Sequence, residues 1–135
     1  DDTVTIAALF QSLLSMLYRL GEDNQRWRIY SRMLISENTW RAQRYGIAGS
    51  LIDFGRGELV PVLNLTDEIV EMVREDAEEL NCVEEVEHAR HIARTGTSAQ
   101  RQLDVYRGAI TDGASESEAL IAVVDHLIVE TVAGT

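Results

Sequence analysis

The sequence predicts a mainly α-helical protein of five to six helices with one short β-hairpin. Apolar residues recur at helical spacing through most of the 135 residues. Residues able to cap helix N-termini precede several of these segments. The strand-like pattern is confined to residues 46–62, a segment with four glycines and the only proline. Hydrophobic residues make up 45% of the chain, which is enough for one domain with a sizeable core.

The first two expected helices cover about residues 4–20 and 24–45. The apolar arc of the first is wide, so we expect this helix to be buried on more than one side. It would then pack against something more, such as a sheet outside this chain. Asn24 is the expected N-cap of the second helix, and Gly46 can end it.

A β-hairpin is expected at about residues 50–62, where two short apolar runs flank Gly55-Arg56-Gly57. Two strands alone are marginally stable, so the hairpin should lean on the helices. Four further helices are expected at about residues 67–80, 82–95, 99–108 and 116–132. Their expected caps include Thr66, Thr97 or Ser98, and Ser115 or Ser117, and Ser115 has capping-box spacing to Glu118.

The charge balance is strongly acidic, with 23 acidic against 12 basic residues and a net charge of -11. This field opposes non-specific binding to nucleic acid or anionic lipid, so neither nucleic acid nor a membrane is expected as a partner. No apolar run approaches the roughly 20 residues that span a bilayer, which predicts a soluble protein. Every basic residue is arginine. A lysine-free acidic surface fits a high-salt cytoplasm, and a GC-rich genome is the alternative explanation.

The single cysteine, Cys82, allows no internal disulfide and fits a reducing compartment, so we expect a cytoplasmic protein. A small buried hydrophobe is its expected role. The chain starts at Asp1 without an initiator methionine, from which we expect a fragment or a processed chain.

Polar side chains with binding capacity gather at the end of the second expected helix. Asn38, Arg41 and Tyr45 share one stripe, and Glu37, Arg41 and Arg44 share an overlapping one. Two guanidinium groups one turn apart can grip a carboxylate or a phosphate. The alternative is a surface Glu37–Arg41 pair worth less than about 1 kcal/mol, and spacing alone favours that alternative.

Two other patterns suggest ligands less strongly. His88 and His91 lie three residues apart with acidic neighbours, but no HExxH or matching carboxylate helix accompanies them, so no metal site is expected. The segment 96–102 places a glycine and hydroxyls where a helix could receive an anion, and a plain helix cap is the preferred interpretation.

Three ordered segments resemble the C-terminal part of the carboxylate–amine ligases, also called type 2 glutamate–cysteine ligases. The first, with the pattern Glu-Asn-Arg/Lys-Trp-x-Ala-x-Arg-Tyr-Gly in the family, corresponds to residues 37–46, followed by Leu51-Ile52-Asp53 and Val60-Pro61. The second is residues 96–102, and the third is residues 123–131. Thr39 stands where a basic residue is common, and Ser98 where a glycine is common.

The resemblance implies the helical C-terminal part of a glutamine-synthetase-like α+β ligase, inactive without the N-terminal catalytic sheet. It implies ATP and Mg²⁺ as cofactors, bound mainly outside this chain, and glutamate with cysteine or another amine as substrates. The product would be γ-glutamylcysteine, a step of glutathione biosynthesis. Arg41 and Arg44 are the expected catalytic residues, and Asn38 and Tyr45 the expected substrate-binding residues.

Three further expectations remain open. The composition suggests a halophilic archaeon as the source. The oligomeric state is open, and a homo-oligomer is one option. The competing function is a non-catalytic acidic helical module for interaction or assembly, which the wide apolar arc of residues 4–20 would serve.

Overall fold

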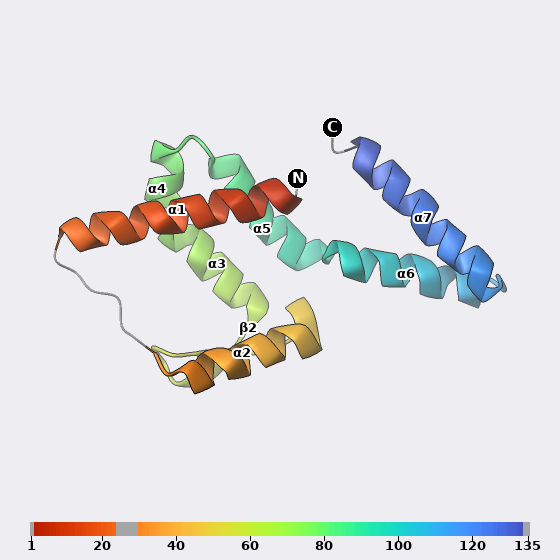
Figure 1. Ribbon diagram of the computed structural model, residues 1–135, viewed down its shortest axis with the longest axis horizontal. Helices are drawn as coiled ribbons and strands as arrows, with labels where there is room; N and C mark the ends of the chain where they lie inside the picture. The colour runs from red at the N-terminus through yellow and green to blue at the C-terminus, as the bar shows by residue number, and fades with distance from the viewer. Residues whose placement is uncertain (1, 24–29, 134–135) are drawn as a thin grey trace. The chain divides into compact units, whose positions relative to one another are not determined.

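A computed structural model describes residues 2–23 and 30–133, which form two compact units, Asp1–Thr95 and Gly96–Thr135 (Figure 1). Within these residues the fold is mainly helical with one β-hairpin, as predicted. The elements are α1 (Asp2–Glu22), α2 (Arg32–Tyr45), the 3₁₀ turn η1 (Gly46–Ala48), β1 (Ser50–Asp53), β2 (Glu58–Pro61), α3 (Val62–Met72), α4 (Arg74–Glu79), α5 (Val83–Thr95), α6 (Ser98–Thr111) and α7 (Glu116–Ala133).

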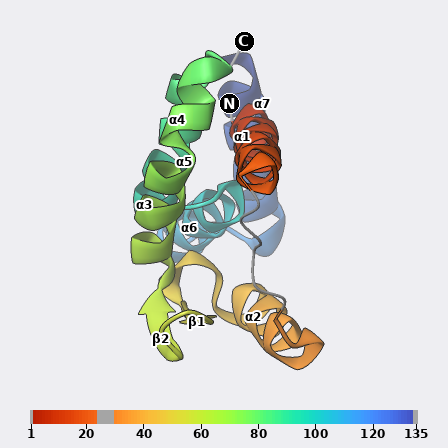
Figure 2. The ribbon, with the colours of Figure 1, turned by 90° about the vertical axis from the view of Figure 1, so that its left-hand side faces the viewer.

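The core of the first unit lies where α1 packs on α4 and α5, and where α3 packs on α5. Figure 2 shows α1 nearly end-on beside these helices, which it crosses. Apart from Met16, the buried side chains of this core are small or β-branched. The buried cluster is Ala8, Met16, Val70, Val73, Ala77, Val86 and Ala89.

An ion pair with a buried carboxylate joins α1 to α4. The side chain of Asp76 is only 1% exposed, and Arg19 Nη2 donates to its Oδ2 at 2.8 Å. The hydrogen bond from Arg19 lowers the pKa of Asp76, and a further bond from Ser15 acts in the same direction, against the effect of burial. Asp76 therefore remains charged inside the core at neutral pH.

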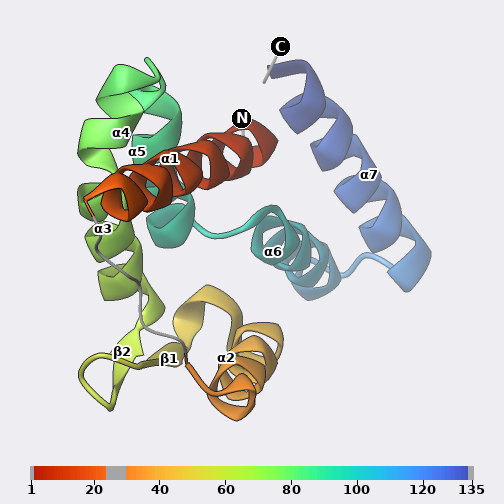
Figure 3. The ribbon, with the colours of Figure 1, turned by 60° about the vertical axis from the view of Figure 1, so that its left-hand side comes forward.

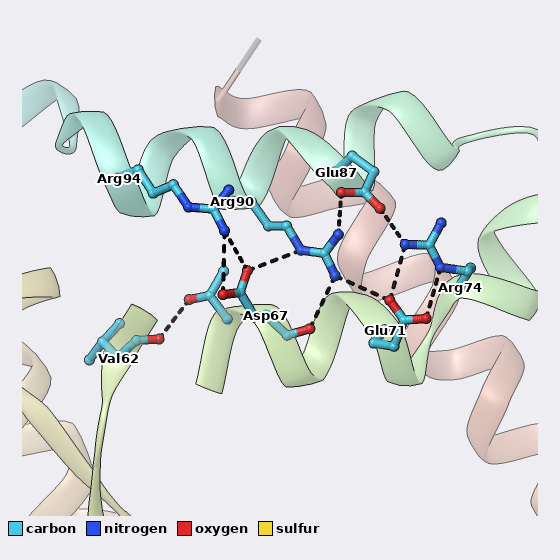
Figure 4. Close-up of polar contacts among 8 residues, drawn as sticks. Val62, Asp67, Glu71, Arg74, Glu87, Arg90 and Arg94 are labelled. Atoms are coloured by element: carbon cyan, nitrogen blue, oxygen red, sulfur yellow. Dashed lines mark hydrogen bonds and ion pairs between the residues drawn. The ribbon is translucent and has the colours of Figure 1, made fainter. Parts of the chain in front are cut away.

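A chain of arginines and carboxylates joins α3 to α5 (Figure 4). Arg90 donates to Glu71 on α3 at 3.2 Å and to Glu87 on its own helix at 2.7 Å. Arg74 bridges Glu71 and Glu87, while Arg94 reaches Asp67 at 3.1 Å. The cluster has three positive and three negative groups, so its charges balance. Its ion pairs connect α3, α4 and α5.

The hairpin is antiparallel, with Leu51 opposite Val60 and Ser50 opposite Pro61. The N–H of Val62 donates to the carbonyl of Gly49 at 3.1 Å, which continues the ladder beyond the strands. Hydrogen-bonded pairs alternate along an antiparallel ladder, so the Ser50–Pro61 pair falls between them. Pro61 fits there because its missing N–H costs the ladder no bond.

The second unit is a pair of helices, α6 and α7. Ala119 is fully buried within it. Arg101 on α6 donates to Glu130 on α7 at 2.6 Å and to the Gly96 carbonyl at 2.7 Å. The two expected caps are confirmed, since Thr97 accepts from the N–H of Gln100 and Ser115 forms a capping box with Glu118.

Four local predictions are corrected. Tyr30 and Ser31 are not helical, and Ser31 rather than Asn24 caps α2; Asn24 itself lies outside the described residues. Thr66 is not a cap, because α3 starts at Val62 and the Thr66 hydroxyl donates back to the Val62 carbonyl at 2.9 Å. The predicted third helix is divided at Val73 into α3 and α4. The fifth helix runs through Gly108 to Thr111, because the left-handed residue after it is Gly113.

The prediction that no apolar segment approaches the length of a bilayer span is also corrected. The 21 residues of α1 are, by length and composition alone, enough to cross a membrane. One such helix is weak evidence, since a core helix of a soluble protein passes the same test. One side of α1 buries Thr5, Ala8, Ser12 and Met16 in the core described above.

The Arg19–Asp76 pair makes a prediction about pH. Asp76→Asn should lower the free energy of unfolding by about 1–3 kcal/mol at pH 7, because it removes a charged acceptor from a buried hydrogen bond. The pKa of Asp76 is lower in the folded chain than in the unfolded chain, so this contribution is present above the usual carboxyl range and is lost as the pH falls through the folded-state value. Urea unfolding of both proteins from pH 7 to pH 2 measures the difference. A gap that stays constant to pH 2 would contradict the assignment.

Candidate functional site

The candidate site is the surface formed by the C-terminal half of α2, residues 37–45, beside the hairpin. Ser31 starts α2 by accepting a hydrogen bond from the N–H of Met33, and Gly46 ends it with a φ of 56°. Figure 3 shows α2 and the hairpin close to the start of α3 and apart from α1. None of the 14 residues of α2, all of them described, is buried. Contacts with the hairpin, rather than a buried core, therefore hold this helix in place.

Asn38 faces the hairpin and pairs with the main chain of one strand residue. Its Nδ2 donates to the Ile52 carbonyl at 2.9 Å, and its Oδ1 accepts from the Ile52 N–H at 2.7 Å. The side chain does what a residue of a neighbouring strand would do at an open sheet edge. Its predicted role as a substrate ligand stays a prediction, but half of its hydrogen-bonding capacity is used within the protein.

The two arginines of the site differ in environment. Arg41 is largely covered, and its Nε donates to Glu37 Oε1 at 2.8 Å. The ion pair that spacing favoured is therefore formed. Arg44 is exposed and makes no hydrogen bond or ion pair with any residue that the structure describes. The surface thus offers one free guanidinium group and one that is paired but one turn away.

Aromatic rings complete the surface. Tyr45 packs edge-on against Trp40 with ring centroids 5.7 Å apart, and both side chains are about half exposed. The predicted residues Asn38, Arg41, Arg44 and Tyr45 thus lie on one short helical segment. Asn38 faces β1, whereas Arg44 faces solvent. The guanidinium groups of Arg41 and Arg44 are of a kind that binds anionic groups, and the rings of Trp40 and Tyr45 lie on the same helix.

Gly49 is a residue of this site that the sequence analysis did not single out. A Cβ at Gly49 would lie 2.6 Å from Cβ of Tyr45, closer than such atoms approach in proteins. The close contact allows the chain to leave α2, turn through η1 and enter β1. The abundance of glycine in residues 46–57 was the available signal, but it did not show which glycine is spatially required.

The residues considered for metal binding are arranged differently. His88 and His91 stack with ring centroids 5.2 Å apart, and His88 Nε2 lies 3.4 Å from Asp2 Oδ1. Among the described residues, no group of three or more histidine, cysteine or acidic side chains is placed to hold a metal ion. The glycine-containing segment 96–102 serves as a helix cap through Thr97, the preferred interpretation of that segment.

Comparison with known proteins supplies the family. A sequence model described as glutamate-cysteine ligase family 2 matches residues 2–126. The chain belongs to glutamate–cysteine ligase family 2. The resemblance inferred from residues 37–46 and the two later segments is confirmed. An archaeal source stays a prediction.

Curated relatives agree with the family model. Three proteins named "Putative glutamate--cysteine ligase 2" are similar over nearly the whole chain. The protein from Rhodospirillum rubrum is 56% identical over 133 residues, covering 98% of this chain and 34% of the relative. Those from Jannaschia sp. and Sorangium cellulosum are 49% and 46% identical, covering 95% and 99% of this chain and 34% of each relative. The chain therefore spans about a third of their length. No solved structure matches it significantly.

The close contact at Gly49 makes a prediction about stability. Gly49→Ala should lower the free energy of unfolding by about 1–3 kcal/mol, because the added methyl group forces Tyr45 and the turn apart. Gly21→Ala is the control: a Cβ there meets no atom within 4 Å, and alanine favours the helix by up to about 1 kcal/mol. Thermal or urea unfolding compares the two variants. Equal stabilities would show that the turn adapts without cost.

Proposed function

We propose that this chain is part of an ATP-dependent ligase that joins the γ-carboxylate of glutamate to an amine, with cysteine as the first candidate acceptor. The support is membership of the family, the names of the curated relatives, and the arginine-bearing surface on α2. In this reaction a carboxylate oxygen attacks the terminal phosphorus of ATP and ADP leaves. The amine nitrogen then attacks the carbonyl carbon, the bond to phosphate breaks, and the nitrogen loses a proton.

The contribution proposed for this chain is electrostatic. Phosphoryl transfer and the attack on the acyl group develop negative charge on oxygen atoms, which fixed guanidinium groups stabilise. The exposed Arg44 is the observation that carries the proposal, because it is a free cation on a chain with a net charge of -11. Arg41 can join it by exchanging Glu37 for a ligand oxygen. Tyr45 and Asn38 border the same surface.

ATP and Mg²⁺ are proposed to bind mainly outside this chain. An anionic phosphate suits the arginines of α2, whereas the described residues contain no cluster of carboxylates or histidines that suits a metal ion. No step is therefore assigned to Mg²⁺ here. The remaining two thirds of the relatives' length is the proposed location of the N-terminal catalytic sheet.

The arginines can be tested in the full-length protein. Arg41→Ala and Arg44→Ala should each lower kcat/KM by about 100-fold, the usual effect of removing one fixed donor from developing charge. Steady-state phosphate release with ATP, glutamate and cysteine measures this. Arg32→Ala removes an exposed arginine from the other end of α2 and should leave the rate unchanged. Wild-type kinetics in both Arg41 and Arg44 variants would contradict the proposed role.

The exposed apolar side of α1 supports the proposal that this chain is part of a larger protein. Ile6, Phe10, Leu14 and Tyr18 follow one another at four-residue intervals and are all exposed, Phe10 to 64%. No charged residue occurs between Asp2 and Arg19. We propose that the catalytic sheet in the rest of the polypeptide covers this stripe, as the wide apolar arc of residues 4–20 suggested. A module for assembly with other copies is the competing interpretation.

The proposed contact between the sheet and α1 predicts different effects of the same substitutions in the full-length protein and in the 135-residue chain. Phe10→Ser with Leu14→Ser should destabilise the full-length protein by about 3–5 kcal/mol, since two large side chains would lose their burial. The same pair should change the stability of the 135-residue chain by less than about 0.5 kcal/mol, because both side chains are exposed in it. Gln11→Ser on the same helix is the control. A concentration-dependent loss of stability in the short chain would instead indicate a second copy.

A further inference from the structure

Asn38 occupies a position that no apolar contact could replace. Because Gly49 pairs with Val62 and the strands continue in the register Leu51–Val60, the main-chain groups of Ile52 point away from β2. They would form an open sheet edge if Asn38 did not bond both of them. No residue of α2 is buried. These two short hydrogen bonds therefore fix the rotation of the helix about its axis and its position along the strand.

We infer that Asn38 is a positioning residue for the arginines of the α2 surface, an inference that rests on the proposed function. Arg41 lies three residues after Asn38, and Arg44 lies six residues after it. The rotation of one rigid helix therefore sets the direction in which each arginine side chain leaves the helix. Among the described residues, Asn38 makes the side-chain hydrogen bonds between α2 and the hairpin, so the helix can rotate about its remaining contacts when these bonds are lost. Misplacement of a reacting group by about 1 Å can reduce a rate by 100-fold.

The chemistry of the anchor requires a carboxamide of this length. Asparagine donates to the Ile52 carbonyl through Nδ2 and accepts from the Ile52 N–H through Oδ1. The single oxygen of a serine or threonine hydroxyl does not offer two separate atoms for these bonds. Aspartate has the same shape but no donor, so it would place a charged oxygen against the Ile52 carbonyl. Asn38→Asp therefore introduces repulsion between the side chain and the Ile52 carbonyl, whereas Asn38→Ala only removes the two hydrogen bonds.

Kinetics of the full-length protein separate positioning from direct binding. Asn38→Asp should lower kcat by 10-fold to 100-fold while the KM values for ATP, glutamate and cysteine stay within about twofold. The loss should shrink to less than threefold when Arg41 and Arg44 are already alanine, because the helix then has nothing to position. A raised KM with little change in kcat would overturn the inference and make Asn38 a substrate ligand.

Hydrogen exchange supplies the structural arm of the same experiment. The Ile52 amide should exchange at least 10-fold faster in Asn38→Asp than in the wild type. Asn64→Asp makes the same chemical change at an exposed position of α3 and should alter neither exchange nor rate. Faster exchange with unchanged kcat would overturn the positioning role and leave a purely structural anchor. A wild-type protein with no ligase activity would overturn the proposed function, and the positioning role with it, whatever the exchange shows.

Discussion

Pairing between arginine and carboxylate groups on different helices is the interaction on which both units depend. The core residues are small, so apolar contacts bring the helices together without fixing their registration. Arg19 fixes α1 on α4, Arg90 fixes α5 on α3, and Arg101 fixes α6 on α7. The more exposed of these pairs contribute little stability each, whereas the pair at the buried Asp76 contributes more, and the planar fork of arginine gives all of them a defined geometry.

This use of arginine changes how the composition is interpreted. The absence of lysine suggested a high-salt cytoplasm or a GC-rich genome, and neither explanation depends on structure. Several of the twelve arginines are bound at sites where a lysine would lose a second contact, such as Arg74 between Glu71 and Glu87. Arg44, by contrast, is exposed on a helix that it does not help to hold. An exposed arginine that serves no helix contact, such as Arg44, keeps its charge available.

The sequence predicted the helices, the hairpin and the family, because these follow from periodicity and short motifs. It misplaced several helix ends, since Thr66 has the chemistry of a cap yet bonds back to Val62 within the helix. It predicted that Asn38 binds substrate, which stays a prediction, but it did not indicate that this side chain is paired within the protein. Its partner is the main chain of Ile52. Every residue has the same main-chain atoms, so a sequence does not show which of them a side chain will bond. The clearance at Gly49 is equally invisible, because only the fold decides which glycine stands against Tyr45.

A polar anchor suits α2 better than an apolar one. A helix held by an apolar face would bury about half of its side chains, and residues beside that face would be partly covered. Asn38 instead holds α2 through one side chain and two hydrogen bonds, which leaves Arg44, Trp40 and Tyr45 open on the same short helix. Because the two bonds engage the N–H and the carbonyl of one strand residue, they resist rotation of the helix as well as its separation from the strand. A surface that must present charge at a defined angle gains from this arrangement.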